Sequence, residues 1–569
     1  MQRQSDAAIT FSRAFSSSGR GSDGWPPQAR AFASAAAGIL CLTGFLWNAG
    51  NADLSSWLES RNEDVGDEDE MHTVLNWSGT HKVELPAASY HEPETSEELE
   101  DLLRKCHQSG TPLRPIGSAL SPNGIGFQRM GMVNLINLDD LIEVDVKNMT
   151  VTVQAGARVG QVVDALREYG MTLPNLASIA EQQMGGFVQI GAHGTGAKIT
   201  SVDDFVTSLN IVTPKLGTIT LTPEDGERFN LAKVGLGCFG IVSQVTMKCV
   251  KAHNLVEHTF VLTRNEARSQ LDTLLKRHKH MRYMWIPFED AVVVVTNDPE
   301  GMTTKEDSLA MKKPADKIFS EEERFQPFTD LLIELSTKAD EPFTKDSVKG
   351  MGFGEIRDAL LAIDPLDKEH VKRVNKSEAE YWRRSAGYQI KPSDQLLQFD
   401  CGGQQWVWEI CFPTGTLEEN TGNDMAVLER ILKVIEDDDI PAPAPIEQRW
   451  SASSSSLMSP SHGTPGGLHS WVGIIMYLPS DDEHQREAIT REFKGTYCEQ
   501  LRKIGYDFNA ASHWAKLEFP PDPEGLAKLM TFMSNRYPLD KFNALRREYD
   551  PKNILGNSLI NVILGSPED

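Results

Sequence analysis

Apolar residues recur at helical spacing in two segments of the N-terminal half of the chain, residues 95–110 and 158–170. In each segment, four apolar residues follow the i, i+3, i+4, i+7 pattern that places them on one face of an α-helix. A glycine, Gly110 or Gly170, stands where a helix commonly ends. The pattern therefore predicts two amphipathic helices. Their apolar residues are Leu99, Leu102, Leu103 and Cys106 in the first helix, and Val159, Val162, Val163 and Leu166 in the second.

Alternation of apolar and polar residues predicts strands around these helices. It continues on both sides of residues 147–148 and again through residues 209–222, and each stretch is typical of a β-hairpin. Residues 240–250 and 470–479 are apolar enough to be buried strands, while the serine-rich residues 451–467 are predicted to form a low-complexity loop. Helices mixed with hairpins favour an α+β fold over a continuous parallel sheet.

The first fifty residues differ in composition from the rest of the chain. They contain four arginines, seven serines, no lysine and only two acidic residues, which is typical of a mitochondrial targeting segment; a disordered tail is the alternative. Residues 31–52 are uncharged, and they form only a marginal membrane segment because a spanning helix needs about 20 apolar residues. The acidic residues 59–70 are too polar to form a core. We therefore assign residues 1–70 to targeting, a marginal hydrophobic segment and an acidic linker.

Net charge and cysteine spacing narrow the classes of partner. The formal net charge of −25 repels nucleic acid, which excludes it as an expected partner, and favours basic proteins. The seven cysteines are scattered without a C-x-x-C pair, which argues against a zinc module or a disulfide scaffold. We expect reduced thiols and no metal site.

Three glycine-rich segments, residues 114–127, 184–200 and 234–242, lie next to apolar, strand-like stretches. Glycine leaves the backbone N–H groups accessible, and successive N–H groups in a turn can hold an anion. In a chain with this negative charge, such backbone dipoles suit the diphosphate of a nucleotide. No G-x-G-x-x-G motif joins a strand to a helix with an acidic residue further on, which disfavours a nicotinamide-dependent enzyme.

The same segments carry a family resemblance. Four segments resemble the FAD-binding domain of the PCMH or vanillyl-alcohol-oxidase type. They are RPIGSALSPNGIGF, VTVQAGARV, ASIAEQQMGGFVQIGAHGTGA and GLGCFGIVSQVTM. Three further segments resemble the aldonolactone oxidoreductases of that superfamily. They are LQFDCGGQQWV, PAPAPIEQRW and SHWAKLE. The resemblance covers about residues 72–564 and implies a two-domain α+β flavoprotein. Residues 71–252 are expected to form the FAD-binding domain. Residues 253–569 are expected to form an α+β substrate or cap domain whose C-terminal segment returns to the flavin.

The resemblance implies FAD as the cofactor. Many relatives bond FAD covalently through a histidine in the first glycine-rich loop, and Leu120 occupies that position here, so we expect non-covalent binding. His193 is the alternative attachment point, although a packed or hydrogen-bonded histidine beside the diphosphate is favoured. The positions that match the cofactor-binding motifs are Pro115, Gly117, Ser118, Leu120, Ser121, Ala177, Ser178, Gly185, Gly186, Gly191, His193, Gly194, Thr195, Gly196, Ile241 and Val242.

Oxidation of a secondary alcohol by a flavin requires hydride loss from carbon to flavin N5, proton loss from oxygen and stabilisation of negative charge on the flavin. Cationic side chains in a dry pocket serve the last two needs. Glu447 and Arg449 lie two residues apart, so they point to the same side of an extended strand. The family pattern gives this pair substrate-binding and catalytic roles, and a surface ion pair is the alternative. Lys516 is the second catalytic cation that the pattern implies, and an exposed lysine is its alternative.

Two further residues bear on reactivity through the resemblance. Cys401 matches a cysteine that lies close to the substrate in relatives, and we expect a redox-sensitive thiol that takes no chemical part in turnover. Ala177 matches a gate residue over the flavin edge. Its methyl group is expected to close a path to oxygen that glycine would open. This predicts a dehydrogenase that passes electrons to a basic carrier, cytochrome c.

The resemblance therefore implies an FAD-dependent aldonolactone dehydrogenase that converts L-galactono-1,4-lactone to L-ascorbate with cytochrome c as acceptor. The implied location is the mitochondrial inner membrane, facing the intermembrane space. One alternative is an L-gulono- or arabinono-lactone oxidase that uses oxygen. Another is a protein whose main role is in the assembly of respiratory complex I.

Overall fold

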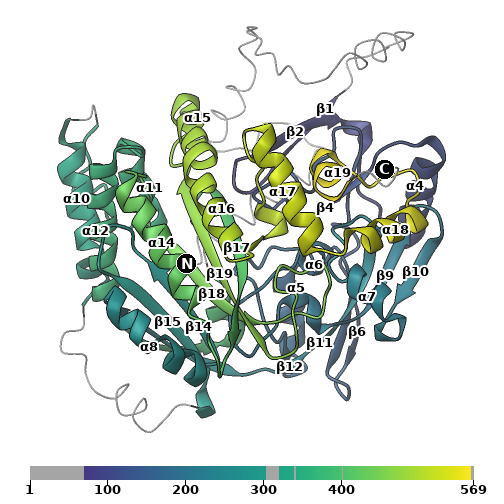
Figure 1. Ribbon diagram of the computed structural model, residues 1–569, viewed down its shortest axis with the longest axis horizontal. Coiled ribbons are helices and arrows are strands. Elements are labelled where there is room, and N and C mark those ends of the chain that lie inside the picture. The colour runs from purple at the N-terminus through teal and green to yellow at the C-terminus, as the bar shows by residue number, and fades with distance from the viewer. Residues whose placement is uncertain (1–69, 303–318, 339–340, 400–401, 566–569) are drawn as a thin grey trace. The chain divides into compact units, whose positions relative to one another are not determined.

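The computed structural model describes residues 70–302, 319–338, 341–399 and 402–565, all within one compact unit that begins at Asp69 (Figure 1). The predicted targeting, hydrophobic and acidic segments lie outside the described residues, apart from Glu70, and so does Cys401. Within the described part of the chain, each helix is too short or too polar to cross a bilayer. The five cysteines described there are free and buried.

An antiparallel five-stranded sheet, in the order β10-β9-β11-β7-β6, underlies the first folded region. Both predicted hairpins are confirmed, because β6 pairs with β7 and β9 pairs with β10. The predicted buried strand is β11. The bounds are β6 (Leu141–Asp145), β7 (Thr150–Gln154), β9 (Val206–Thr213), β10 (Gly217–Leu221) and β11 (Ile241–Lys248).

The two predicted helices are also confirmed, as α4 (Ser96–Ser109) and α5 (Val159–Arg167). Thr95 caps α4 by accepting a hydrogen bond from the backbone N–H of Glu98 at 3.1 Å. Gly110 ends the same helix in the left-handed conformation.

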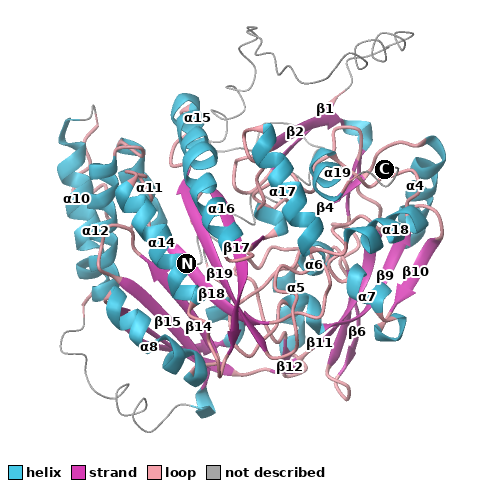
Figure 2. Ribbon diagram, in the orientation of Figure 1, coloured by secondary structure: helices cyan, strands magenta, loops and turns pink. Residues whose placement is uncertain are grey.

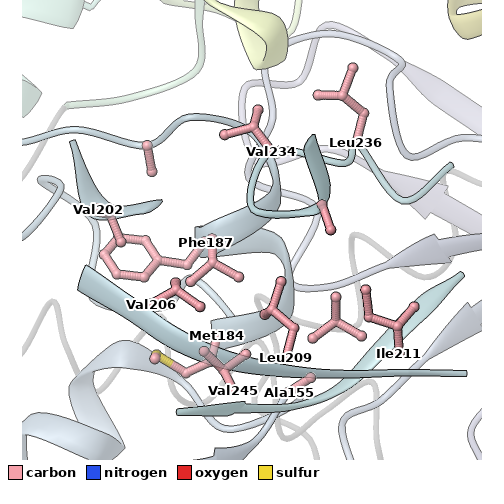
Figure 3. Close-up of a cluster of buried hydrophobic side chains, with 14 of the residues drawn as sticks. Ala155, Met184, Phe187, Val202, Val206, Leu209, Ile211, Val234, Leu236 and Val245 are labelled. Atoms are coloured by element: carbon pink, nitrogen blue, oxygen red, sulfur yellow. The ribbon is translucent and has the colours of Figure 1, made fainter. Parts of the chain in front are cut away.

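Helix α6 (Met184–Gln189) packs onto the five-stranded sheet. Figure 3 shows its Met184 and Phe187 among the side chains of Val206 and Leu209 from β9. This packing fixes the second glycine-rich segment against the sheet. Shorter elements complete the region: β1 (Met71–Leu75), β2 (Lys82–Pro86), β3 (Tyr90–His91), β4 (Arg114–Ile116), β5 (Met132–Asn134), β8 (Met171–Thr172), α7 (Glu227–Ala232) and β12 (Val250–Lys251).

A second, eight-stranded sheet has the order β16-β13-β15-β14-β18-β19-β17-β20. The predicted strand at residues 470–479 is its interior strand β19, between β18 and β17. Neighbouring strands are antiparallel throughout. The bounds are β13 (Asn254–Leu262), β14 (His280–Trp285), β15 (Val292–Pro299), β16 (Gly387–Pro392), β17 (Gln405–Thr416), β18 (Ile446–Ala452), β19 (Gly467–Tyr477) and β20 (Ala511–Ser512).

Helices cover one face of this sheet and form a second hydrophobic cluster with it (Figure 2). They are α8 (Arg264–Arg277), α14 (Asn423–Asp437), α15 (Glu483–Glu492) and α16 (Cys498–Asp507). A further cluster joins α10 (Glu321–Leu335), α11 (Phe353–Ile363) and α12 (Lys368–Arg384), and α13 (Ser393–Leu397) follows β16.

The serine-rich segment 451–467 forms the predicted loop between β18 and β19, but much of it is buried. Its first two residues belong to β18, and Ser454 and Ser461 are completely buried. The hydroxyl of Ser454 donates to the carboxylate of Asp203 at 2.6 Å. The segment can be buried despite its polarity because its hydroxyl groups find partners in the first folded region.

The C-terminal helices return to the first folded region. Met533, Phe542 and Ile560 belong to the same buried cluster as Leu103 and Leu113, and Figure 1 shows these yellow helices beside the purple N-terminal elements. The helices are α17 (Pro523–Arg536), α18 (Leu539–Tyr549) and α19 (Ser558–Leu564). Two sheets with helices packed on them confirm the α+β fold; the domain boundary at residue 252 stays a prediction.

Candidate functional site

The first glycine-rich loop follows β4 and is tied to the second by hydrogen bonds. Ser118 Oγ donates to the carbonyl of Glu181 at 2.6 Å. Asn134 Nδ2 donates to the carbonyl of Gly117 at 3.3 Å, and Asn134 Oδ1 accepts from Gln183 Nε2 at 3.1 Å. The loops therefore hold one another in place. The predicted cofactor residues of this region, half-buried except for the exposed Gly186, are Pro115, Gly117, Ser118, Leu120, Ser121, Ala177, Ser178, Gly185 and Gly186.

The second loop continues into a buried segment, residues 191–196, which includes the predicted Gly191 and Gly194. A Cβ atom on Gly194 would lie 2.2 Å from Asn175 Oδ1, so only glycine fits this close approach. The buried segment is therefore packed directly against the loop that leads into Ala177.

The same buried segment also contacts the eight-stranded sheet. The hydroxyl of Thr195 donates to the carbonyl of Met281 in β14, and Gly196 N–H donates to the carbonyl of Trp450 in β18 at 2.7 Å. The buried segment 191–196 and the strand β18, which carries Glu447 and Arg449, are therefore neighbours. The predicted cofactor residues Ile241 and Val242 open β11, where both side chains lie in the buried core.

Ala177, the predicted gate residue, is half-buried at the edge of the first hydrophobic cluster. The carbonyl of the adjacent Ser178 accepts a hydrogen bond from the backbone N–H of Phe399 at 3.0 Å. The Phe399 ring contacts two guanidinium groups, with its centroid 3.8 Å from Arg282 Cζ and 5.4 Å from Arg449 Cζ. The loop that carries Ala177 and the guanidinium of Arg449 are therefore joined through Phe399.

Glu447 and Arg449 form a partly buried ion pair on β18 rather than a fully exposed one. Arg449 Nη2 donates to Glu447 Oε2 at 2.5 Å, and the side chains are 10% and 24% exposed for arginine and glutamate respectively. Ile446 and Trp450 point to the opposite, helix-covered face, as the period of two in a strand requires. The prediction that Glu447 and Arg449 share one face of a strand is thus confirmed.

Arg282, which the sequence analysis missed, adds a second guanidinium beside this pair. It lies on β14 directly opposite Arg449, and its Nη1 is 3.8 Å from Glu447 Oε1. Burial alone raises the pKa of Glu447, but Arg449 and then Arg282 outweigh burial and hold the pKa below its usual value. Glu447 is therefore ionised at neutral pH and acts as a hydrogen-bond acceptor.

Lys516 lies in the short 3₁₀ helix η9 (Trp514–Lys516) and pairs with Glu409, a second residue missed in the sequence. Lys516 Nζ donates to Glu409 Oε2 at 2.7 Å, and His193 Nε2 lies 3.2 Å from the same oxygen. Burial raises the pKa of Glu409, but Lys516 and His193 outweigh it and hold the pKa well below its usual range. The buried carboxylate is therefore ionised and fixes the position of the Lys516 ammonium.

His193 is packed and hydrogen-bonded on both sides. Its ring stacks on Trp471 with a centroid separation of 3.7 Å, and its Nδ1 lies 3.0 Å from the carbonyl of Gly194. Burial lowers the pKa of His193, and the neighbouring Glu409 opposes this shift. These contacts favour the packed role over attachment to the flavin.

His513 lies beside Glu409 and His193, and its Nδ1 accepts a hydrogen bond from the backbone N–H of Ala515 at 3.1 Å. Burial holds the pKa of His513 well below its usual value. The three side chains could together hold a metal ion, and Lys516 Nζ already donates to Oε2 of Glu409.

The loops of the first folded region fit an FAD molecule. Gly186 has no heavy atom within 4 Å of the place where a Cβ would stand, so its backbone is open to a diphosphate. Gln182 Oε1 is buried and, among the described residues, has no hydrogen-bond partner. Buried polar atoms are normally satisfied, so a bound ligand would account for this one.

Solved structures with a similar fold are known. Cholesterol oxidase from B. sterolicum matches with a TM-score of 0.65 over 87% of this chain and 97% of its own. Its sequence is 15% identical to this one, so the likeness concerns the fold alone.

Two family models match successive parts of the chain. A model described as an FAD binding domain matches residues 87–222. A model described as D-arabinono-1,4-lactone oxidase matches residues 245–563, which is more than half of the chain.

Curated relatives agree with the second model. L-galactono-1,4-lactone dehydrogenase of Arabidopsis thaliana is 46% identical over 86% of this chain and 81% of its own, and a mitochondrial counterpart from Oryza sativa subsp. japonica is 46% identical over 86% and 83%. L-gulonolactone oxidase of Bos taurus is 24% identical over 86% and 97%. The family models and the curated relatives agree. The chain therefore belongs to the aldonolactone oxidoreductase family of flavin-dependent enzymes.

Proposed function

We propose that this protein oxidises L-galactono-1,4-lactone at C2 with FAD as cofactor, and that the keto-lactone formed then enolises to L-ascorbate. The observation that carries the proposal is a set of two partly buried ion pairs, Glu447 with Arg449 and Glu409 with Lys516, beside the cofactor loops. The curated plant relatives named for this substrate support the choice of lactone.

Each member of the site has a distinct task in this proposal. Bound FAD supplies the acceptor for the hydride that leaves the substrate carbon. The ionised Glu447 accepts a hydrogen bond from a substrate hydroxyl and orients it. Arg449 and Lys516 stabilise the negative charge that develops as the hydroxyl proton is lost, an effect that is large in a buried site.

Anaerobic titration of the purified protein tests this function. The oxidised flavin absorbance should bleach on addition of L-galactono-1,4-lactone and return on addition of oxidised cytochrome c. Flavin that stays oxidised with this lactone but is bleached by L-gulono-1,4-lactone would instead support the alternative substrate. A protein that no aldonolactone reduces would refute the proposal.

FAD is proposed to bind non-covalently, because Leu120 offers no nucleophile where relatives carry a histidine, and His193 is already packed and hydrogen-bonded. Denaturation in acid followed by filtration should therefore release all of the yellow colour into the filtrate. Colour retained on the polypeptide would contradict this prediction and point to His193.

The electron acceptor is proposed to be cytochrome c, with Ala177 limiting access of oxygen to the flavin. Replacing Ala177 with glycine removes one methyl group at the half-buried gate and is expected to raise the rate of reoxidation by oxygen several-fold. The measurement is stopped-flow reoxidation of the reduced enzyme in aerated buffer. Ala180→Gly, three residues along the same loop, serves as the control, and equal rates in both variants would contradict the gate.

The net negative charge supports a basic carrier, whose reduction rate should fall as ionic strength rises.

The mitochondrial names of the plant relatives support a mitochondrial location, which we propose to be the inner membrane facing the intermembrane space. The redox-sensitive role of Cys401 and a role in the assembly of respiratory complex I remain predictions that rest on the family resemblance.

A further inference from the structure

Gly473 occupies an unusual place in the eight-stranded sheet. It lies near the middle of β19, and the register pairs it with Glu447 of β18 on one side and Glu409 of β17 on the other. Residues directly opposite one another in a sheet share a face. The two carboxylates therefore flank a position that has no side chain.

Neither the backbone nor the local packing requires glycine at this position. The φ angle of Gly473 lies outside the left-handed region, and a Cβ atom there would make only an ordinary contact, 3.7 Å from Glu409 Oε1. Glycine inside a strand weakens the strand and often marks a place where a ligand approaches closely. The missing side chain is therefore best explained by an occupant outside the sheet.

The surroundings of Gly473 show what such an occupant needs. On its strand, the neighbours on the same face are Ile475 and Trp471, and the ring of Trp471 stacks on His193. Adjacent strands are about 4.8 Å apart, so the backbones of Glu409 and Glu447 are separated by about 10 Å. Both carboxylates are ionised. Lys516 pairs with Glu409, and both Arg449 and Arg282 pair with Glu447. This face thus has a hydrogen-bond acceptor on each side of Gly473, Glu409 on one side and Glu447 on the other, and the ring of Trp471 lies next to it along the strand.

We propose that Gly473 is the floor of the substrate site, and that a polyhydroxylated lactone lies over it with hydroxyl groups donated to Glu447 and to Glu409. This assignment rests on the proposed function and names Gly473 as a residue that determines specificity. A side chain at this position fills the space of the sugar ring and displaces the substrate from its reactive position.

Substitutions of increasing size at Gly473 test the assignment. Gly473→Val should lower kcat/KM for L-galactono-1,4-lactone by about a hundredfold, which is the loss that a displacement of about 1 Å from the reactive position brings. Gly473→Ala should lower it less, mainly through KM. Both variants should keep FAD and be reduced by dithionite as the wild type is, because the cofactor loops lie on other segments.

Gly505→Ala provides the matched control, since Gly505 is buried in α16 and a Cβ there would meet Ala510 and Ile410 rather than the site. Its kcat/KM should be unchanged. A Gly473→Val protein with wild-type kcat/KM would overturn the assignment. If the valine variant does not fold, an unchanged KM in Gly473→Ala has the same meaning. Failure of the wild type to react with any lactone would instead count against the proposed function itself.

Discussion

Arg449→Ala is expected to lower kcat/KM for the lactone by about a thousandfold, the scale of loss when one group that stabilises developing charge is removed from a buried site. The substitution removes the cation nearest to Glu447 and leaves that carboxylate buried with a weaker partner in Arg282. FAD should remain bound, because the cofactor loops are held by hydrogen bonds on other segments, such as Ser118 to Glu181. The measurement is steady-state reduction of cytochrome c at several lactone concentrations, together with the flavin absorbance of the purified variant.

Two controls separate charge from geometry. Arg449→Lys keeps the positive charge but loses the planar donor fork, so its kcat/KM should fall between those of the wild type and the alanine variant. Arg430→Ala removes an exposed arginine that pairs with Asp507 at the surface, and it should leave turnover unchanged. An Arg449→Ala enzyme within threefold of the wild type would show that the pair on β18 does not act on the substrate.

The parts of the structure that could be predicted from the sequence are those set by local spacing. The hairpin at residues 147–148 and the shared face of Glu447 and Arg449 both follow from the period of two along one strand. Neither needs knowledge of any other part of the chain.

Glu409 and Arg282 were missed because their importance depends on strand order. Arg282 stands opposite Arg449, and Glu409 stands opposite Gly473, only because β14, β18, β19 and β17 are neighbours. Alternation of apolar and polar residues tells which face a residue occupies but not which strand lies beside it. In the sequence, Glu409 between the apolar Trp408 and Ile410 has the same pattern as an ordinary solvent-facing residue of a strand.

The second large effect concerns stability and centres on Arg114, a buried arginine at the start of the first glycine-rich loop. Its guanidinium donates to four backbone carbonyls: those of Ile125 at 3.0 Å, Gly237 at 3.1 Å, Leu555 at 2.7 Å and Leu236 at 2.5 Å. One side chain thus joins the first glycine-rich loop, the third glycine-rich segment and the C-terminal segment. Hydrogen bonds from a charged group contribute more than neutral ones, and buried carbonyls left without a partner are costly.

Arg114→Ala is therefore expected to lower the free energy of unfolding by about 3 kcal/mol or more, since several buried acceptors lose their donor at once. The thermal midpoint should be lower both by circular dichroism and by release of flavin fluorescence. The two probes should agree because the hydrogen bonds of Arg114, here called the clamp, hold a cofactor loop. Arg129→Ala, an exposed arginine in the segment that follows the loop, should change neither. If the alanine variant of Arg114 kept its thermal midpoint but lost FAD, the clamp would serve the cofactor alone, and the C-terminal segment would be held to the first folded region by its apolar contacts.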